Sequence, residues 1–175
     1  MSLRTRRYPM RWCPARSPFL LSAQLPAVSY YKYKWSNLMK LNSYLNFNGQ
    51  CEAAFKFYAK VLGGKIEAML PHEGTPAAEH VPAEWRSKIM HARLVIGDKA
   101  LMASDAPPDR SDGAMKGFSV TLGVDSPAEA ERVFAALADK GTVRMPLEQT
   151  FWAARFGMLV DQFGTPWMIN CEKAD

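Results

Sequence analysis

Cysteine is scarce in this sequence, and its spacing excludes two kinds of small stabilised domain. The 175 residues include three cysteines, Cys13, Cys51 and Cys171, with no CxxC pair among them. An odd and widely spaced set predicts neither a disulfide framework nor a zinc ribbon. Free thiols are typical of a reducing compartment, so we expect a cytoplasmic location.

Long apolar runs are also missing. No stretch reaches the roughly 18 consecutive apolar residues that a transmembrane helix requires, so we expect no membrane partner. The composition, 48% hydrophobic and 22% charged, is that of an ordinary globular protein. A length of 175 residues allows one domain of usual size or two small fused modules.

Acidic residues are absent from the first part of the chain, where the first acid is Glu52. Residues 1–38 contain 7 of the 22 basic residues, which leaves 15 to set against 17 acids in the remainder. The formal charge of +5 therefore belongs to this leader, and the remainder carries a net charge of −2. Because the remainder is nearly neutral, whereas a nucleic-acid face needs a clustered basic surface, we expect no nucleic-acid partner.

The leader, residues 1–38, has three competing interpretations. A signal peptide needs a longer apolar segment than this one, which Pro18 and Pro26 interrupt. Its many arginines and missing acids fit a transit peptide loosely. The third interpretation is a translation start assigned too far upstream, with Met39 as a natural beginning directly before the first strand. We expect either a disordered basic leader or such a mis-assigned start.

Beyond the leader, strand and helix periodicities alternate, and the same order occurs twice. The first series has an alternating strand, an amphipathic helix that ends at Gly63-Gly64, a second strand and a hairpin about Gly97-Asp98. The expected ranges are 41–49, 50–64, 65–72 and, for the hairpin, 88–105. A proline-rich loop before the hairpin has room for one helical turn.

The second series repeats this order with a clearer helix start. Ser126, Pro127 and Glu129 form a capping box with proline at the first helical position. The expected ranges are 117–124, 126–141, 142–151, 154–161 and 165–172. The body therefore reads βαβββ twice, as one domain, 39–175, with modules 40–107 and 114–173. We predict an α+β fold whose two modules form a curved mixed sheet around a cavity, because one module alone buries too little surface for a core.

Several motifs in this body resemble a known family. They are Tyr44–Gly49 (YLNFNG), Ala54–Tyr58 (AFKFY), Leu62–Gly64 (LGG), Met90–Ala92 (MHA), Leu101–Asp105 (LMASD), Phe151-Trp152 and Asp161–Asn170 (DQFGTPWMIN). The chain resembles the vicinal oxygen chelate superfamily of glyoxalases, bleomycin-resistance proteins and extradiol dioxygenases, and within it the PhnB-like branch. This resemblance implies a homodimer. Members of the branch often carry the label 3-demethylubiquinone-9 3-methyltransferase, which the residues do not support because the glycine-rich turn of such an enzyme is missing.

Metal-using relatives hold a divalent ion with four His, Gln or Glu side chains, one from each of four strands. The strand period of two gives the corresponding positions here. They hold Asn42 or Ser43, Met102, Ser119 and Met168. Hydroxyls, an amide and thioethers bind hard divalent cations poorly, so we expect no metal and no other cofactor.

The same periodicity places His91 and Arg93 on the cavity face, because Ala92 and Leu94 face the helix. An imidazole can act as a general base or donate to an anion, so His91 is the candidate catalytic residue. The alternative is a histidine satisfied by a neighbouring group. The expected ligand-binding residues are Tyr44, Asn46, His91, Arg93, Met102, Ser119, Trp152, Met168 and Asn170.

Other side chains have two interpretations each. Arg155 could pair with an anionic ligand or with a structural acid. Cys51 opens the first helix, whose dipole lowers a thiol pKa, although an inert buried thiol is the simpler interpretation. We expect Trp167 in the core, and we expect His72 and His80, in the proline-rich loop, to be solvated.

The sequence therefore predicts a homodimeric protein that binds a small organic ligand in its cavity without a metal. The alternative is a lyase, isomerase or dioxygenase-like enzyme of the same fold. Such an enzyme would use His91 as a base or a metal bound by ligands that the motifs do not reveal. A single cavity and a shared fold leave both hypotheses open, since one fold hosts many chemistries.

Overall fold

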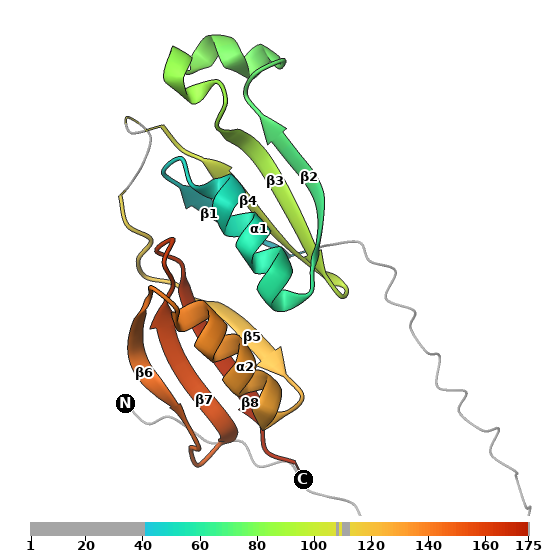
Figure 1. Ribbon diagram of the computed structural model, residues 1–175, viewed down its shortest axis with the longest axis vertical. Helices are drawn as coiled ribbons and strands as arrows, with labels where there is room; N and C mark the ends of the chain where they lie inside the picture. Colours follow the sequence, from blue (N-terminus) through green and yellow to red (C-terminus); the bar gives the residue numbers. More distant parts are fainter. Residues whose placement is uncertain (1–40, 108, 110–112, 175) are drawn as a thin grey trace, which may run out of the picture. The chain divides into compact units, whose positions relative to one another are not determined.

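The computed structural model describes residues 41–107, 109 and 113–174 (Figure 1). The predictions for the leader, residues 1–38, fall outside these residues. The described part contains two four-stranded mixed sheets, each with one helix, and neither sheet closes into a barrel. This arrangement confirms the predicted α+β fold of two βαβββ modules.

The first module contains five long elements and two short 3₁₀ turns. They are β1 (Ser43–Phe47), α1 (Cys51–Leu62), β2 (Lys65–Pro71), η1 (Pro76–His80), η2 (Ala83–Trp85), β3 (Ile89–Ile96) and β4 (Lys99–Asp105). The strand order is β1-β4-β3-β2, with β1 parallel to β4 and the other pairs antiparallel. The 3₁₀ turns account for the helical turn expected in the proline-rich loop.

The second module repeats this topology. It contains β5 (Val120–Val124), α2 (Pro127–Ala138), β6 (Thr142–Glu148), β7 (Ala153–Val160) and β8 (Pro166–Glu172), with the strand order β5-β8-β7-β6. The first strand, β5, is parallel to β8, as β1 is to β4. Strand β5 begins later than the predicted range 117–124, so Ser119 precedes the strand.

The end of α1 and the start of α2 follow the sequence signals, whereas α2 ends at Ala138, short of the predicted 141. Gly63 has a φ of 68°, in the left-handed region that favours glycine, and ends α1. The Ser126 hydroxyl accepts a hydrogen bond from the Glu129 backbone N–H at 3.2 Å, which confirms Ser126 as the N-cap of α2. The Glu129 carboxylate accepts from Arg132, so only the serine half of the predicted capping box is observed. The first helix has no such cap from Gln50, the residue before it. The buried carboxylate of Asp105 accepts from the Cys51 N–H at 2.9 Å in its place.

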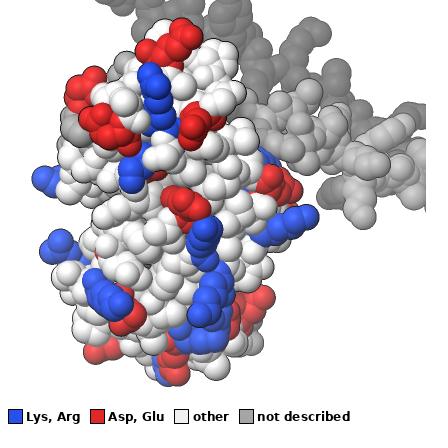
Figure 2. All heavy atoms as spheres, turned by 45° about the horizontal axis from the view of Figure 1, so that its top comes forward, with Lys and Arg blue, Asp and Glu red and all other residues white. Residues whose placement is uncertain are grey.

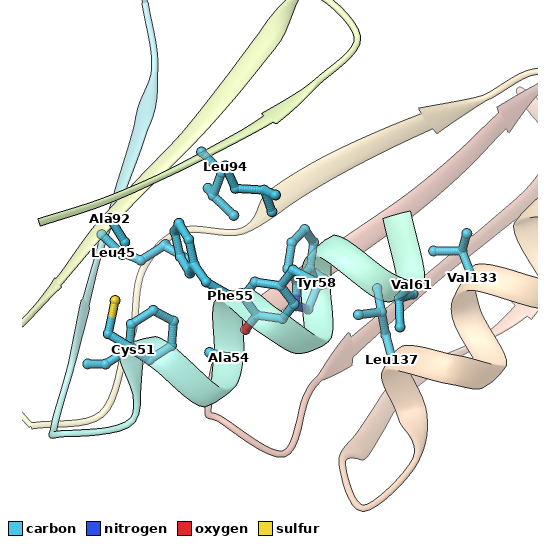
Figure 3. Close-up of a cluster of buried hydrophobic side chains, with 14 of the residues drawn as sticks. Leu45, Cys51, Ala54, Phe55, Tyr58, Val61, Ala92, Leu94, Val133 and Leu137 are labelled. Carbon is cyan, nitrogen blue, oxygen red and sulfur yellow. The ribbon is translucent and has the colours of Figure 1, made fainter. Parts of the chain in front are cut away.

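Buried side chains from both modules form one apolar cluster between the helices and the sheets. Phe55 and Tyr58 of α1 are fully buried, and so is Leu137 of α2. Figure 3 shows Val61 of α1 on the side of Leu137 and Val133 of α2. The two apolar helix faces therefore bury each other's surface as well as that of their own sheets, which a single module could not do.

A buried carboxylate also joins the two modules. Asp161, after β7, accepts hydrogen bonds from the Tyr58 hydroxyl at 2.6 Å and from the Trp167 indole N–H at 2.8 Å. The backbone N–H groups of Phe163 and Thr165 donate to its other oxygen at 2.8 and 3.0 Å. Burial and the negative charge of Asp161 raise the pKa of the Tyr58 phenol, so this hydroxyl keeps its proton at neutral pH.

Candidate functional site

Each sheet has one face covered by its helix and one face turned away from it (Figure 1). In β1 the helix side holds the buried residues Leu45 and Phe47, while Tyr44, directly before Leu45, is 46% exposed. Strand β8 alternates likewise, with Trp167 and Ile169 buried. We call the faces turned away from α1 and α2 the first and second open faces. These burial patterns confirm the faces that strand periodicity predicted.

The first open face brings four of the predicted residues together. Met102 pairs in register with Tyr44 on one side and with Arg93 on the other. The Tyr44 hydroxyl lies 3.5 Å from His91 Nδ1, and the two ring centroids are 6.1 Å apart. A phenol, an imidazole and a guanidinium therefore stand around one thioether on a partly exposed surface.

Arg93 is not free on this face, since its Nε donates to Glu67 Oε2 at 2.9 Å. Both side chains of this ion pair are partly exposed, so water weakens it, to about 0–1 kcal/mol for a typical surface pair. An anionic group of a ligand could therefore compete with Glu67 for the guanidinium at small cost. Farther along β1, Asn46 lies against Ser104, whose hydroxyl donates to the amide oxygen at 3.3 Å.

The second open face is more apolar. Met168 pairs in register with Thr121 and with Met158, and Asn170 pairs with Phe156. The ring of Phe156 lies 5.6 Å from that of Trp152, which is 48% exposed and also contacts Phe151. Sequence periodicity identified Met168, Asn170 and Trp152, but not their neighbours on β6 and β7. Those neighbours depend on the pairing register, which periodicity within one strand does not specify.

Ser119 is the predicted residue that the structure places away from these rows. Ser119 lies an even number of residues from Thr121, which is on the second open face, but it precedes the first residue of β5. Thr121, two residues later, is the residue paired with Met168. By the repeat of the two modules, Thr121 corresponds to Tyr44, which pairs with Met102.

Cavities near the helix ends are lined by described residues, and three of them are considered in turn. One of about 380 Å³ at the start of α1 is lined by Asn46, Gln50 and Phe163, and one of about 620 Å³ at the start of α2 is lined by Asn170 and Asp125. The third, of about 490 Å³, is mostly apolar and is lined by residues of both modules, with Leu62, Leu101, Leu122 and Trp167 among them. Asn46 and Asn170 are thus the predicted ligand-binding residues that line a cavity here.

The donor set does not fit a divalent metal ion. The four corresponding strand positions hold an amide or hydroxyl, a thioether, a hydroxyl and a second thioether. Within the part of the chain that the structure describes, no three His, Cys, Asp or Glu side chains gather closely enough to hold an ion. Hard or borderline divalent cations need such ligands, so the side chains at these four positions are unsuitable for a catalytic divalent metal ion.

The prediction that His72, in the proline-rich loop, is solvated is wrong. His72 is 8% exposed, not solvated, and neither ring nitrogen has a hydrogen-bond partner among the described protein atoms. The loop folds back on itself, because the His72 N–H donates to the Lys88 carbonyl at 3.0 Å and the Glu73 N–H to the Arg86 carbonyl at 2.7 Å. His80 is exposed, as expected.

Arg155 and Trp167 have structural environments. The Arg155 guanidinium lies on the helix side of the second sheet and pairs with Glu131 of α2 at 3.0 Å. Trp167 is fully buried. Both observations favour the structural interpretation of these residues over a role in ligand binding.

We expect Cys51 to be unreactive. Its side chain is fully buried, and burial, followed by the charges of Asp105 and Glu52, raises the thiol pKa far above its ordinary range. Because the thiolate is the nucleophile, iodoacetamide at neutral pH should modify native Cys51 at least about 100-fold more slowly than Cys51 in denaturant. Peptide mass spectrometry of the labelled protein measures both rates. Equal rates would show that the helix dipole, not burial, controls this thiol.

The described residues include no helix with the length and apolarity needed to cross a bilayer. A family model, Glyoxalase/Bleomycin resistance protein/Dioxygenase superfamily, matches residues 40–169. The chain is 34% identical to protein YjdN from Escherichia coli (strain K12) over 143 residues, which cover 77% of this chain and 97% of YjdN.

Two solved structures are also similar. Protein PA1353 from Pseudomonas aeruginosa is 54% identical with a TM-score of 0.72, over 78% of this chain and 99% of PA1353. A PhnB protein from Bacillus cereus, which bears the 3-demethylubiquinone-9 3-methyltransferase label, is 21% identical with a TM-score of 0.64. That match covers 76% of this chain and 99% of the PhnB protein, and it shows a shared fold.

Proposed function

Because the chain belongs to the Glyoxalase/Bleomycin resistance protein/Dioxygenase superfamily, we propose that it binds a small organic ligand on its open faces without a divalent metal ion. The observation that carries this proposal is the grouping of Tyr44, His91 and Arg93 around Met102. Small-molecule sites combine a mostly apolar surface with a few polar anchors. The first open face supplies the anchors, and the second supplies thioether and aromatic surface.

We further propose that the protein is a homodimer and that a second copy covers the open faces. Large apolar side chains remain exposed on or beside them, with Tyr44 at 46% and Phe151 at 87% exposed. An apolar surface of this kind marks an interaction site. A ligand cavity enclosed by the open faces would then exist only in the dimer. Light scattering should give twice the chain mass at micromolar concentration, and a monomer would contradict the proposal.

A second candidate function is catalysis with His91 as a general base. The observation that favours it is the contact of 3.5 Å between Tyr44 and His91 Nδ1, which would hold the ring so that Nε2 meets a ligand. A lyase or isomerase reaction needs only such a proton transfer. Dioxygenase-like chemistry would need a metal, for which the donor set is unsuitable.

The test begins with elemental analysis of the purified protein, followed by a thermal-shift screen of a small-molecule library. We expect substoichiometric divalent metal and at least one compound that raises the Tm, since a ligand of the native state stabilises it. One tightly bound zinc, nickel or iron per chain would overturn the metal-free proposal.

The compound from that screen then tests His91. We expect His91→Ala to weaken binding about tenfold, the effect of losing one hydrogen bond of roughly 1.4 kcal/mol. The control is His80→Ala, a change in an exposed histidine of the proline-rich loop, which should leave Kd unchanged. If the protein turns the compound over and His91→Ala abolishes this turnover, the result supports the enzyme hypothesis. Unchanged affinity and turnover would remove His91 from both hypotheses.

We also propose a cytoplasmic location and no nucleic-acid partner. The two cysteines in the described residues, Cys51 and Cys171, are free thiols, which a reducing compartment preserves. Figure 2 shows acidic side chains beside the basic ones over the face in view, including beside the short row of basic side chains on its lower half. A nucleic-acid surface would need a continuous basic patch.

A further inference from the structure

Three methionines stand side by side across the second open face. Met145 of β6 pairs in register with Met158 of β7, and Met158 pairs with Met168 of β8. Paired residues on antiparallel strands point to the same face, with Cα atoms about 4.5–5.5 Å apart. Three adjacent strands therefore contribute one thioether each to a single row, which we call the methionine row.

The methionine row is not part of the apolar core. All three side chains are partly exposed, and none belongs to the buried cluster or to the residues packed against it. The pairing register shifts on both sides of Met145, as it does at β-bulges, which re-aim side chains. Leu147 packs on the helix side of the same strand, against Gly157, so the irregularity separates Leu147 from Met145.

The chemistry of the row differs from that of a divalent metal site. Thioethers are neutral and polarisable, and soft sulfur ligands select Cu(I) over hard cations. Methionine has three rotatable bonds, so the outer two side chains can lean toward the central one. The next residue in the row, Thr121 beside Met168, is neutral and adds no repulsive charge.

We infer that Met145, Met158 and Met168 bind one soft monovalent cation of the d¹⁰ type, Cu(I) or its analogue Ag(I), through three thioether sulfurs. The site shares the second open face, and Met168, with the proposed organic ligand, but it requires no residue of the first open face and is tested without that ligand. It would confer sensitivity to monovalent copper on the face that the second copy or the ligand is proposed to cover.

The first module provides an internal control. Met102 occupies the position that corresponds to Met168, since Tyr44–Met102 and Thr121–Met168 are equivalent pairs of the two sheets. Its neighbour on β3 is Arg93, a cation, where the second sheet has Met158. Met102 is therefore a single thioether beside a positive charge, and we expect it to bind no such ion.

The experiment is a titration of the full chain, labelled with ¹³C at the methionine methyl groups, with Ag(I) in chloride-free buffer. We expect the methyl resonances of Met145, Met158 and Met168 to shift together up to one equivalent, while that of Met102 stays in place. Met158→Leu should weaken Ag(I) binding at least tenfold, and Met102→Leu should leave it unchanged. Met-to-Leu changes conserve volume, so both variants should fold.

The titrations use a Cys13→Ser background, which removes a thiol that could bind Ag(I) outside the described residues. Met145→Leu is a second variant of the methionine row and is tested in the same way as Met158→Leu. The inference is wrong if the three methyl resonances are unchanged at one equivalent of Ag(I). It is equally wrong if Met158→Leu and Met145→Leu both bind as the original protein does. Neither result affects the organic ligand, whose binding is measured without silver.

Discussion

Replacing Asp161 with alanine is expected to lower the free energy of unfolding by about 3–5 kcal/mol, because several donors lose a charged acceptor at once. The carboxylate accepts from four donors, which are the Tyr58 hydroxyl, the Trp167 indole and the backbone N–H groups of Phe163 and Thr165. Alanine leaves these buried donors without their acceptor, and each unsatisfied group costs roughly 1–3 kcal/mol. The turn that follows Asp161 can relax, so the total loss of stability is smaller than the sum of the four separate costs.

Urea unfolding followed by tryptophan fluorescence measures this loss. Tyr58→Phe is the matched control, because it removes one donor and keeps the aromatic packing, and we expect it to cost about 1 kcal/mol. Asp161→Asn should fall between the two, since its amide oxygen can accept but its NH₂ group faces donors. If Asp161→Ala costs no more than Tyr58→Phe, the Asp161 carboxylate does not hold the two modules together.

The second large effect is expected at Asp105, where alanine should cost about 2–4 kcal/mol, because two buried backbone donors lose their acceptor. The carboxylate accepts from the Cys51 N–H at the start of α1 and from the Ile89 N–H at the start of β3, each at 2.9 Å. The start of α1 has no side-chain cap of its own. Removing the acceptor therefore loosens the helix start and two strand ends together.

The rate at which iodoacetamide modifies Cys51 gives a second measurement on the Asp105→Ala variant. The charge of Asp105 is one cause of the raised thiol pKa, so iodoacetamide should modify Cys51 faster in Asp105→Ala than in the original protein. For the stability loss alone, Glu52→Ala is the control, because Glu52 is exposed and its ion pair with Lys56 is a surface pair worth about 0.3–0.5 kcal/mol. Equal stability losses in the two variants would contradict the role assigned to Asp105.

Much of the candidate site follows from local pattern. Alternation in β8 predicts that Trp167 and Ile169 are buried and that Met168 lies on the other face, as observed. Alternation in β3 places His91 and Arg93 together in the same way. These predictions succeed because the direction of a side chain from a strand depends on its immediate neighbours in sequence.

The neighbours of these residues could not be predicted in the same way. Met145 and Met158 lie beside Met168 only because of the pairing of β6, β7 and β8, with register shifts on both sides of Met145. His72 is likewise buried where its N–H donates to the Lys88 carbonyl and the Glu73 N–H to the Arg86 carbonyl across the loop, which the proline-rich composition does not reveal. Pairing between distant segments is a property of the assembled fold.

The sequence by itself determined the order of the elements, the two repeated modules, the end of α1, the start of α2 and the face of each strand that meets a helix. These depend on periodicity and capping within a few residues. The tertiary structure alone decided which side chains share a face across strands, which acid joins the modules and which histidine is buried. Those outcomes depend on long-range register and on hydrogen bonds that form only when the whole chain has packed.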